Sequence, residues 1–187
     1  MNKNINRLTA AGVLIALAIL IPQLFHLTGV PQSGQVFLPM HIPVLLSGFV
    51  LGPVFGLFVG IFSPIISSAM TGMPAFARLP FMIFELATYG LVGGFLYNTL
   101  RLKRKKYGIY VSLVVSMLSG RAIYAFALTI AASVFNIACG GPIAAMNATV
   151  TGAIGIVIQL VIIPPMIFLL EKSGCLDRFF RSCIQQS

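Results

Sequence analysis

The sequence predicts an all-α fold: a polytopic membrane protein whose single domain, residues 1–187, is a six-helix transmembrane bundle. Two observations predict this class. Only 8% of the residues are charged and 58% are hydrophobic, whereas about a quarter of the residues of a soluble domain are charged. The mean hydropathy is +1.01, and apolar runs close to the roughly twenty residues that span a bilayer recur along the chain. No water-facing surface is possible with so few charges.

Six helices are expected from these runs. Their approximate ranges are 8–25, 39–51, 54–70, 78–100, 108–134 and 148–170, and a short basic tail, 171–187, follows. Gly52 and Pro53 make the turn between the second and third helices. Glycine recurs every four residues at Gly48, Gly52, Gly56 and Gly60. Because glycine lets helix backbones approach closely, this ladder predicts two short, close-packed helices divided by the turn.

The basic residues predict the orientation of the bundle. Ten of the twelve lie in three blocks: Lys3 and Arg7, residues 101–106, and the tail from Lys172 to Arg181. Lysine and arginine gather in short cytoplasmic loops, so the N- and C-termini are both expected in the cytoplasm. The predicted outer loops, 26–38, 71–77 and 134–147, contain neither residue. The net charge of +9 is therefore interpreted as a topology signal, and no nucleic-acid partner is expected.

Two charges fall inside predicted spans, where each costs about 2.5–3.5 kcal/mol on insertion scales. Glu85 shares a face of the fourth helix with Arg78 and Tyr89, and Arg121 shares a face of the fifth with Tyr124. Two interpretations stay open: an internal Glu85–Arg121 ion pair that locks two helices, or contact with a polar ligand.

The candidate substrate-binding residues combine these side chains with a histidine near the outer start of the second helix and an asparagine of the third outer loop. They are His41, Arg78, Glu85, Tyr89, Arg121, Tyr124 and Asn147. Gln159, in the sixth helix, is interpreted as a hydrogen bond between helices. The first helix carries a pair of small residues, Gly12 and Ala16, that suits close packing against another membrane helix.

The sequence lacks the motifs of ATP hydrolysis, nucleophilic catalysis and metal binding. The chain has no P-loop sequence for ATP and no nucleophile–base–orienter set, so no catalytic residue is predicted and an enzyme is not expected. Cys139, Cys175 and Cys183 are odd in number and form no metal-ligand cluster with histidine. No metal and no cofactor is expected.

Three segments resemble a known family. FLPMHIPVLLSGFVLGPVFGLFVGIFSP, SSAMTGMP and FELATYGLVGGFLY are similar to the substrate-binding (S) subunits of energy-coupling factor (ECF) vitamin transporters, the riboflavin-transporter-like group included. The resemblance implies a multi-pass protein of the cell membrane, which in bacteria is the cytoplasmic membrane. It also implies that this subunit binds a vitamin or vitamin precursor with high affinity. It also implies a membrane scaffold (T) subunit and two cytoplasmic ATPase (A) subunits as partners.

The resemblance also implies where the ligand and the partner bind. The pocket is expected in the outer half of the bundle, beneath loops 26–38 and 134–147, and the scaffold is expected to dock on the first helix. Family members often carry an alanine-xxx-alanine pattern there, for which Gly12 and Ala16 stand in this chain. By this resemblance, the favoured ligand is pyridoxine or hydroxymethylpyrimidine, and pantothenate comes next. The carboxylate of pantothenate would bind Arg78 or Arg121.

Two other functions remain open. One is a proton-coupled secondary transporter of a small polar metabolite, with Glu85 as the proton relay. Its weakness is that the chain shows no inverted repeat. The other is a membrane enzyme, which the scarcity of acid–base groups disfavours.

Overall fold

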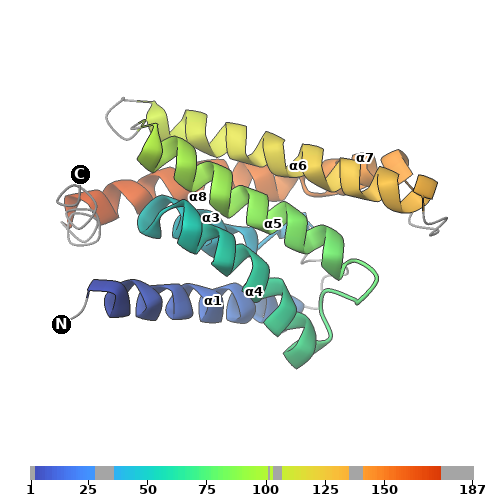
Figure 1. The fold of residues 1–187 in the computed structure, drawn as a ribbon, viewed down its shortest axis with the longest axis horizontal. Coiled ribbons are helices and arrows are strands. Elements are labelled where there is room, and N and C mark those ends of the chain that lie inside the picture. Colours follow the sequence, from blue (N-terminus) through green and yellow to red (C-terminus); the bar gives the residue numbers. More distant parts are fainter. Residues whose placement is uncertain (1–2, 28–35, 101, 103–106, 135–140, 174–187) are drawn as a thin grey trace.

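A computed structural model describes residues 3–27, 36–100, 102, 107–134 and 141–173 (Figure 1). Every regular element within these ranges is a helix. In chain order they are α1 (Lys3–Leu27), α3 (His41–Leu51), α4 (Pro53–Thr71), α5 (Leu79–Gly94), the π-helical η1 (Phe95–Thr99), α6 (Gly108–Val134), α7 (Gly141–Thr151) and α8 (Ala153–Lys172).

Five of the helical segments are long and apolar enough to cross a membrane, and α3 is a shorter apolar helix. The spanning segments are Ile5–Leu24, Pro53–Thr71, Leu79–Thr99, Gly108–Ser133 and Ala153–Lys172. This confirms the predicted all-α, polytopic membrane fold. The cytoplasmic location of the termini stays a prediction.

The short helix α3 lies at the centre of the bundle. It packs against α1, α4, α5 and α8, and ten of its eleven residues are buried. Helix α5 is also central, between α4 and α6, while α1 covers the opposite side of α3 and α4 (Figure 1). An apolar helix too short to span a bilayer is therefore surrounded by protein.

Glycines bring α3, α4 and α5 into backbone contact. A Cβ atom added at Gly56 would lie 2.7 Å from both Gly48 Cα and the carbonyl carbon of Gly90. One added at Gly94 would lie 2.7 Å from Gly48 O. Only glycine permits such an approach. The predicted close packing of the two helices on either side of the turn is confirmed, with α5 as the surface on which both pack. Only α3 is short, since the 19 residues of α4 are enough to cross a membrane.

The turn between α3 and α4 depends on one residue. Gly52 has φ of 99°, which side chains disfavour, and Pro53 follows at the first position of α4, where its missing N–H costs nothing. The amide of Asn98 donates hydrogen bonds to the carbonyls of Gly48, at 3.1 Å, and Phe49, at 3.2 Å. Gly48 O also accepts the backbone N–H of Gly52 at 3.1 Å, whereas the residue four positions after Phe49 is Pro53, which has no N–H to donate, so Asn98 supplies the donor that the Phe49 carbonyl lacks.

The last helix differs from its prediction. Residues 134–147 are predicted as a loop and 148–170 as one helix, but Gly141–Thr151 is the separate helix α7, and Gly152 divides it from α8. A Cβ at Gly152 would lie 2.9 Å from Arg121 Nη2, so a larger residue would crowd this junction. Residues 28–35 of the predicted outer loop 26–38 and residues 135–140 of the predicted outer loop 134–147 lie outside the described residues, as do most of the 101–106 block and the tail beyond residue 173.

Candidate functional site

The site is built around the carboxylate of Glu85, which is 3% exposed. Its Oε1 accepts a hydrogen bond from the Tyr89 hydroxyl at 2.9 Å and lies 3.2 Å from Nη1 of Arg121. His41 Nε2 lies 3.8 Å from the same oxygen. We call these four residues the buried cluster. It joins α3, α5 and α6.

Local sequence explains why these side chains meet. Glu85 and Tyr89 are four residues apart on α5 and therefore share one face. A Cβ at Gly120 would collide with the ring of Tyr89, coming within 3.0 Å of its Cζ, so the glycine next to Arg121 leaves room for that ring. The ring of His41 lies 5.2 Å from the ring of Tyr89, tilted by 56°. Each of the three helices thus supplies at least one side chain, and α6 also supplies, at Gly120, the space for the ring of Tyr89.

The cluster contains more polar nitrogen atoms than the described residues satisfy with hydrogen bonds. Both ring nitrogens of His41 and the Nε and Nη2 atoms of Arg121 are buried and have no hydrogen-bond partner among the described residues. A buried polar atom without a partner costs about 1–3 kcal/mol. An ion pair whose only role is to join two helices is expected to have its remaining donors satisfied as well. The arrangement can hold a polar molecule that accepts hydrogen bonds.

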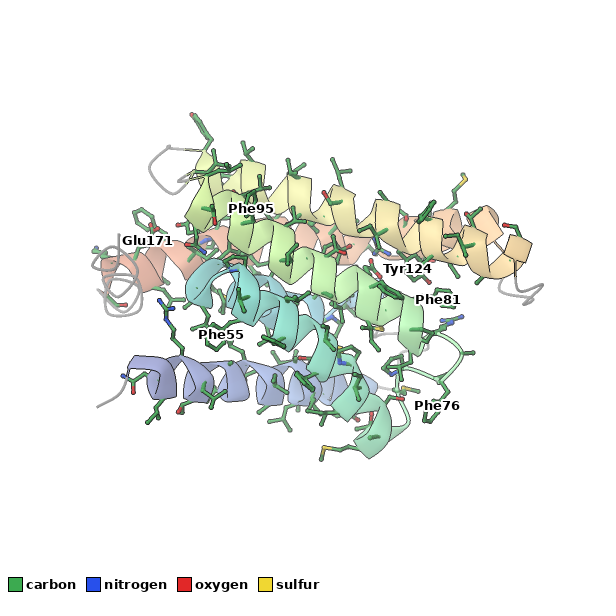
Figure 2. All side chains as sticks on the ribbon, viewed as in Figure 1. Phe55, Phe76, Phe81, Phe95, Tyr124 and Glu171 are labelled. Atoms are coloured by element: carbon green, nitrogen blue, oxygen red, sulfur yellow. The ribbon has the colours of Figure 1, made fainter. Side chains whose placement is uncertain are left out.

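Three predicted site residues lie elsewhere. Arg78 is exposed at the N-terminal cap of α5, two turns or about 10.5 Å along the helix from Glu85. Asn147 is exposed on α7. Tyr124 is one turn beyond Arg121 on α6 and packs, half-buried, in a small cluster with Phe81 (Figure 2). The structure thus brings His41, Glu85, Tyr89 and Arg121 together, and leaves Arg78 and Asn147 at the surface.

Gln159 was not among the predicted site residues. It is fully buried in α8, and its Nε2 donates to Leu38 O at 3.4 Å. The bond joins α8 to the non-helical backbone that precedes α3, not to a second helix as predicted, and Oε1 has no partner among the described residues. A single amide in a long apolar run was the available signal.

Metal ligation has no basis in the described part of the chain, where no group of three His, Cys, Asp or Glu side chains is placed to hold an ion. Cys139, Cys175 and Cys183 lie outside the described residues.

The predicted docking pair lies on the outside of the bundle. Gly12 and Ala16 are both exposed on α1, and an added Cβ at Gly12 would meet nothing within 4 Å. Beside them runs an apolar groove between α1 and α4 with a volume of about 450 Å³. Phe55, Phe58 and Phe62 line its α4 side (Figure 2 labels Phe55).

Comparison with protein families finds one match. Residues 6–167 match the family described as ECF transporter, substrate-specific component. The matched range includes the whole buried cluster and Gln159. No curated protein and no solved structure is significantly similar to the chain.

Proposed function

The chain belongs to the family of ECF transporter substrate-specific components, and on that premise we propose that it binds a water-soluble vitamin or vitamin precursor at the buried cluster. A member of this family is a transport component, not an enzyme. The observation that carries the proposal is the group of four buried nitrogen atoms of His41 and Arg121 that have no partner among the described residues. A polar ligand between α3, α5 and α6 would satisfy them.

The chemistry of the cluster favours a small heterocycle, with pyridoxine or hydroxymethylpyrimidine as the leading ligands. Glu85 provides an acceptor and Arg121 provides donors, so a ring with a donor and an acceptor side by side has a partner for each. Tyr89 and His41 supply aromatic surface, against which a flat ring packs well. Pantothenate is the second ligand, because its carboxylate would pair with the free donors of Arg121.

In this proposal the Glu85–Arg121 ion pair both stabilises the bundle and positions Arg121 for the ligand. The pair holds the guanidinium through Nη1, while Nε and Nη2 stay available. Fixing the guanidinium before the ligand arrives lowers the entropy lost on binding. A structural ion pair and a ligand contact are therefore compatible roles for Glu85 and Arg121. A variant that replaces both residues distinguishes the two roles.

The family also supports partners of general kinds: a membrane-embedded T subunit and two cytoplasmic A subunits that supply ATP hydrolysis. We place the docking face for the T subunit on the exposed side of α1, around Gly12 and Ala16. With the termini in the cytoplasm, His41 at the start of α3 and the N-terminal part of α5 fall in the outer half of the cell membrane. Ligand captured from outside would enter there.

Binding by the purified chain tests the proposal. The protein is extracted in mild detergent, any co-purifying molecule is identified by mass spectrometry, and pyridoxine, hydroxymethylpyrimidine and pantothenate are titrated by calorimetry. Saturable binding of one of the two heterocycles is expected. Saturable binding of pantothenate alone would move the assignment to the carboxylate ligand. Absence of binding for every water-soluble vitamin would contradict the proposal.

Proton-coupled transport is the second candidate, since Glu85 is a buried carboxylate with His41 beside it. Uptake into vesicles that contain this chain without ATPase subunits, abolished by an uncoupler, would favour that function. We expect no such uptake, because members of this family draw on separate ATPases.

A further inference from the structure

Gln159 is held in one orientation by the backbone before α3. Its amide nitrogen faces Leu38 O at 3.4 Å, and the same carbonyl accepts the backbone N–H of His41 at 3.1 Å. A carbonyl oxygen can only accept. The NH₂ group of Gln159 must therefore face Leu38, and Oε1 is directed away from that carbonyl.

The face of α8 that carries Gln159 borders the buried cluster. Gly152, Gly155 and Gln159 are spaced by three and four residues, so they lie on one side of the helix. At the Gly152 end, an added Cβ would lie 2.9 Å from Arg121 Nη2. At the Gln159 end, the shared Leu38 carbonyl links the amide to His41. This face therefore begins beside the guanidinium of Arg121 and packs at Gly155 on the backbone of Val36 and Phe37. At Gln159 it shares a carbonyl with the backbone N–H of His41.

Charge and hydrogen bonding along this face are complementary. Arg121 Nε and Nη2 are donors, and Gln159 Oε1 is a fully buried acceptor, all without partners among the described residues. We propose that Gln159 is a ligand-binding residue whose Oε1 accepts a hydrogen bond from a ring amino or hydroxyl group of the ligand, while Arg121 donates to a ring acceptor. The inference rests on the proposed function and deepens it. It assigns the site a small heterocycle with a donor group.

The competing explanation is a purely structural glutamine. Leu38 has a left-handed backbone, with φ of 48°, which is uncommon outside glycine, and Gln159 helps to hold that peptide. Such a role depends on Nε2 alone, whereas ligand recognition depends on Oε1. The two roles are separable because glutamate keeps an acceptor oxygen but, when ionised, loses the donor.

The experiment compares Gln159→Met, which loses both groups, with Gln159→Glu, which keeps the acceptor. Ser112→Ala is the matched control, since Ser112 is equally buried with an unpartnered hydroxyl but lies nine residues, about 13.5 Å, along α6 from Arg121. Calorimetry gives the dissociation constants of hydroxymethylpyrimidine and of its analogue with hydrogen in place of the ring amino group. Their ratio is the readout, because a structural defect weakens both ligands alike.

We expect the wild type to favour the amino compound by about tenfold, the size of one lost hydrogen bond of about 1.4 kcal/mol. Gln159→Met should bring the ratio near one, while Gln159→Glu and Ser112→Ala should retain it. Should Gln159→Met fail to fold, Gln159→Asn, which withdraws the oxygen by one methylene, should lower the ratio in the same direction.

An unchanged ratio in Gln159→Met or Gln159→Asn overturns the inference, and so do equal ratios in Gln159→Met and Gln159→Glu. These results leave the proposed function intact, because the wild type still binds the pyrimidine. Wild-type protein that binds neither pyrimidine but binds pantothenate overturns the heterocycle assignment and the inference together. Wild-type protein that binds no vitamin overturns the proposed function itself.

Discussion

Replacing Arg121 with alanine is the most direct test of the site. The substitution removes a guanidinium whose Nη1 lies 3.2 Å from Glu85 Oε1. Among the described residues, it leaves the buried carboxylate with Tyr89 and His41 as its polar neighbours. Removing one partner of a buried ion pair costs about 3–5 kcal/mol. Arg121→Ala is therefore expected to lower the unfolding temperature of the protein in detergent.

The same substitution removes two donors, Nε and Nη2, that the proposed ligand would use. A hydrogen bond from a charged group contributes about 1.5–3 kcal/mol, so the loss of one such bond should raise the dissociation constant roughly 10- to 150-fold. Arg78 provides the matched control, because it is an exposed arginine at the N-terminal cap of α5. Arg78→Ala should change affinity by no more than about threefold, in line with surface substitutions generally.

A double variant separates binding from stability. Replacing a buried pair by neutral side chains of similar size is often neutral or stabilising, so Glu85→Gln with Arg121→Met should recover most of the unfolding temperature lost by Arg121→Ala. Calorimetric titration of the same samples should still show weak binding. The reasoning is refuted if the double variant recovers stability and affinity together, since the pair would then be structural alone. It is also refuted if Arg78→Ala weakens binding more than Arg121→Ala.

Three further substitutions test the fold outside the cluster. Gly60→Ala would place a Cβ 2.5 Å from Leu86 O, and because backbone cannot yield cheaply, it should destabilise the protein by about 1–3 kcal/mol in thermal unfolding. Gly12→Ala, with open space around it, should leave the unfolding temperature nearly unchanged, and an equal loss in both would count against glycine-mediated packing. Tyr97→Phe removes the hydrogen bond that the Tyr97 hydroxyl donates to Glu171, at the end of α8 (Figure 2). The loss should lower the free energy of unfolding by about 0.5–1.5 kcal/mol and leave ligand affinity unchanged. A change in affinity would show that this hydrogen bond is coupled to the buried cluster.

The sequence determined much of the fold because its signals are local. Apolar run length specified the spanning helices, and the glycine spacing anticipated the close contact between α3 and α4, although not the packing of both on α5. The division at Gly152 was missed because Gly141, Pro142 and Asn147 are typical of a loop. Proline early in a helix costs nothing, so the same residues also suit the start of α7.

The candidate site was only partly predictable. The Glu85–Tyr89 pair follows from helical spacing, and the Arg121 partnership was one of two interpretations, since intramembrane charges usually pair. His41 lies on a different helix, so its position beside Glu85 and Tyr89 depends on how α3 packs against α5. No local sequence pattern predicts that packing. Gln159 was recognised as buried, but its orientation depends on the Leu38 carbonyl, whose left-handed backbone is set by packing.

Glycine performs two different tasks in this chain, and the difference explains how polar groups are accommodated inside it. Between α4 and α5, Gly60 brings backbone against backbone, which excludes any side chain. Around the cluster, Gly120 faces the ring of Tyr89 and Gly152 faces Nη2 of Arg121, so each gives room to a large polar side chain. The tightly packed helices thus form a rigid support, and the polar side chains gather where glycine opens space on α6 and at the junction between α7 and α8. Because pre-positioned polar groups lose little freedom on binding, this division of roles suits the proposed binding of a small polar molecule at the buried cluster.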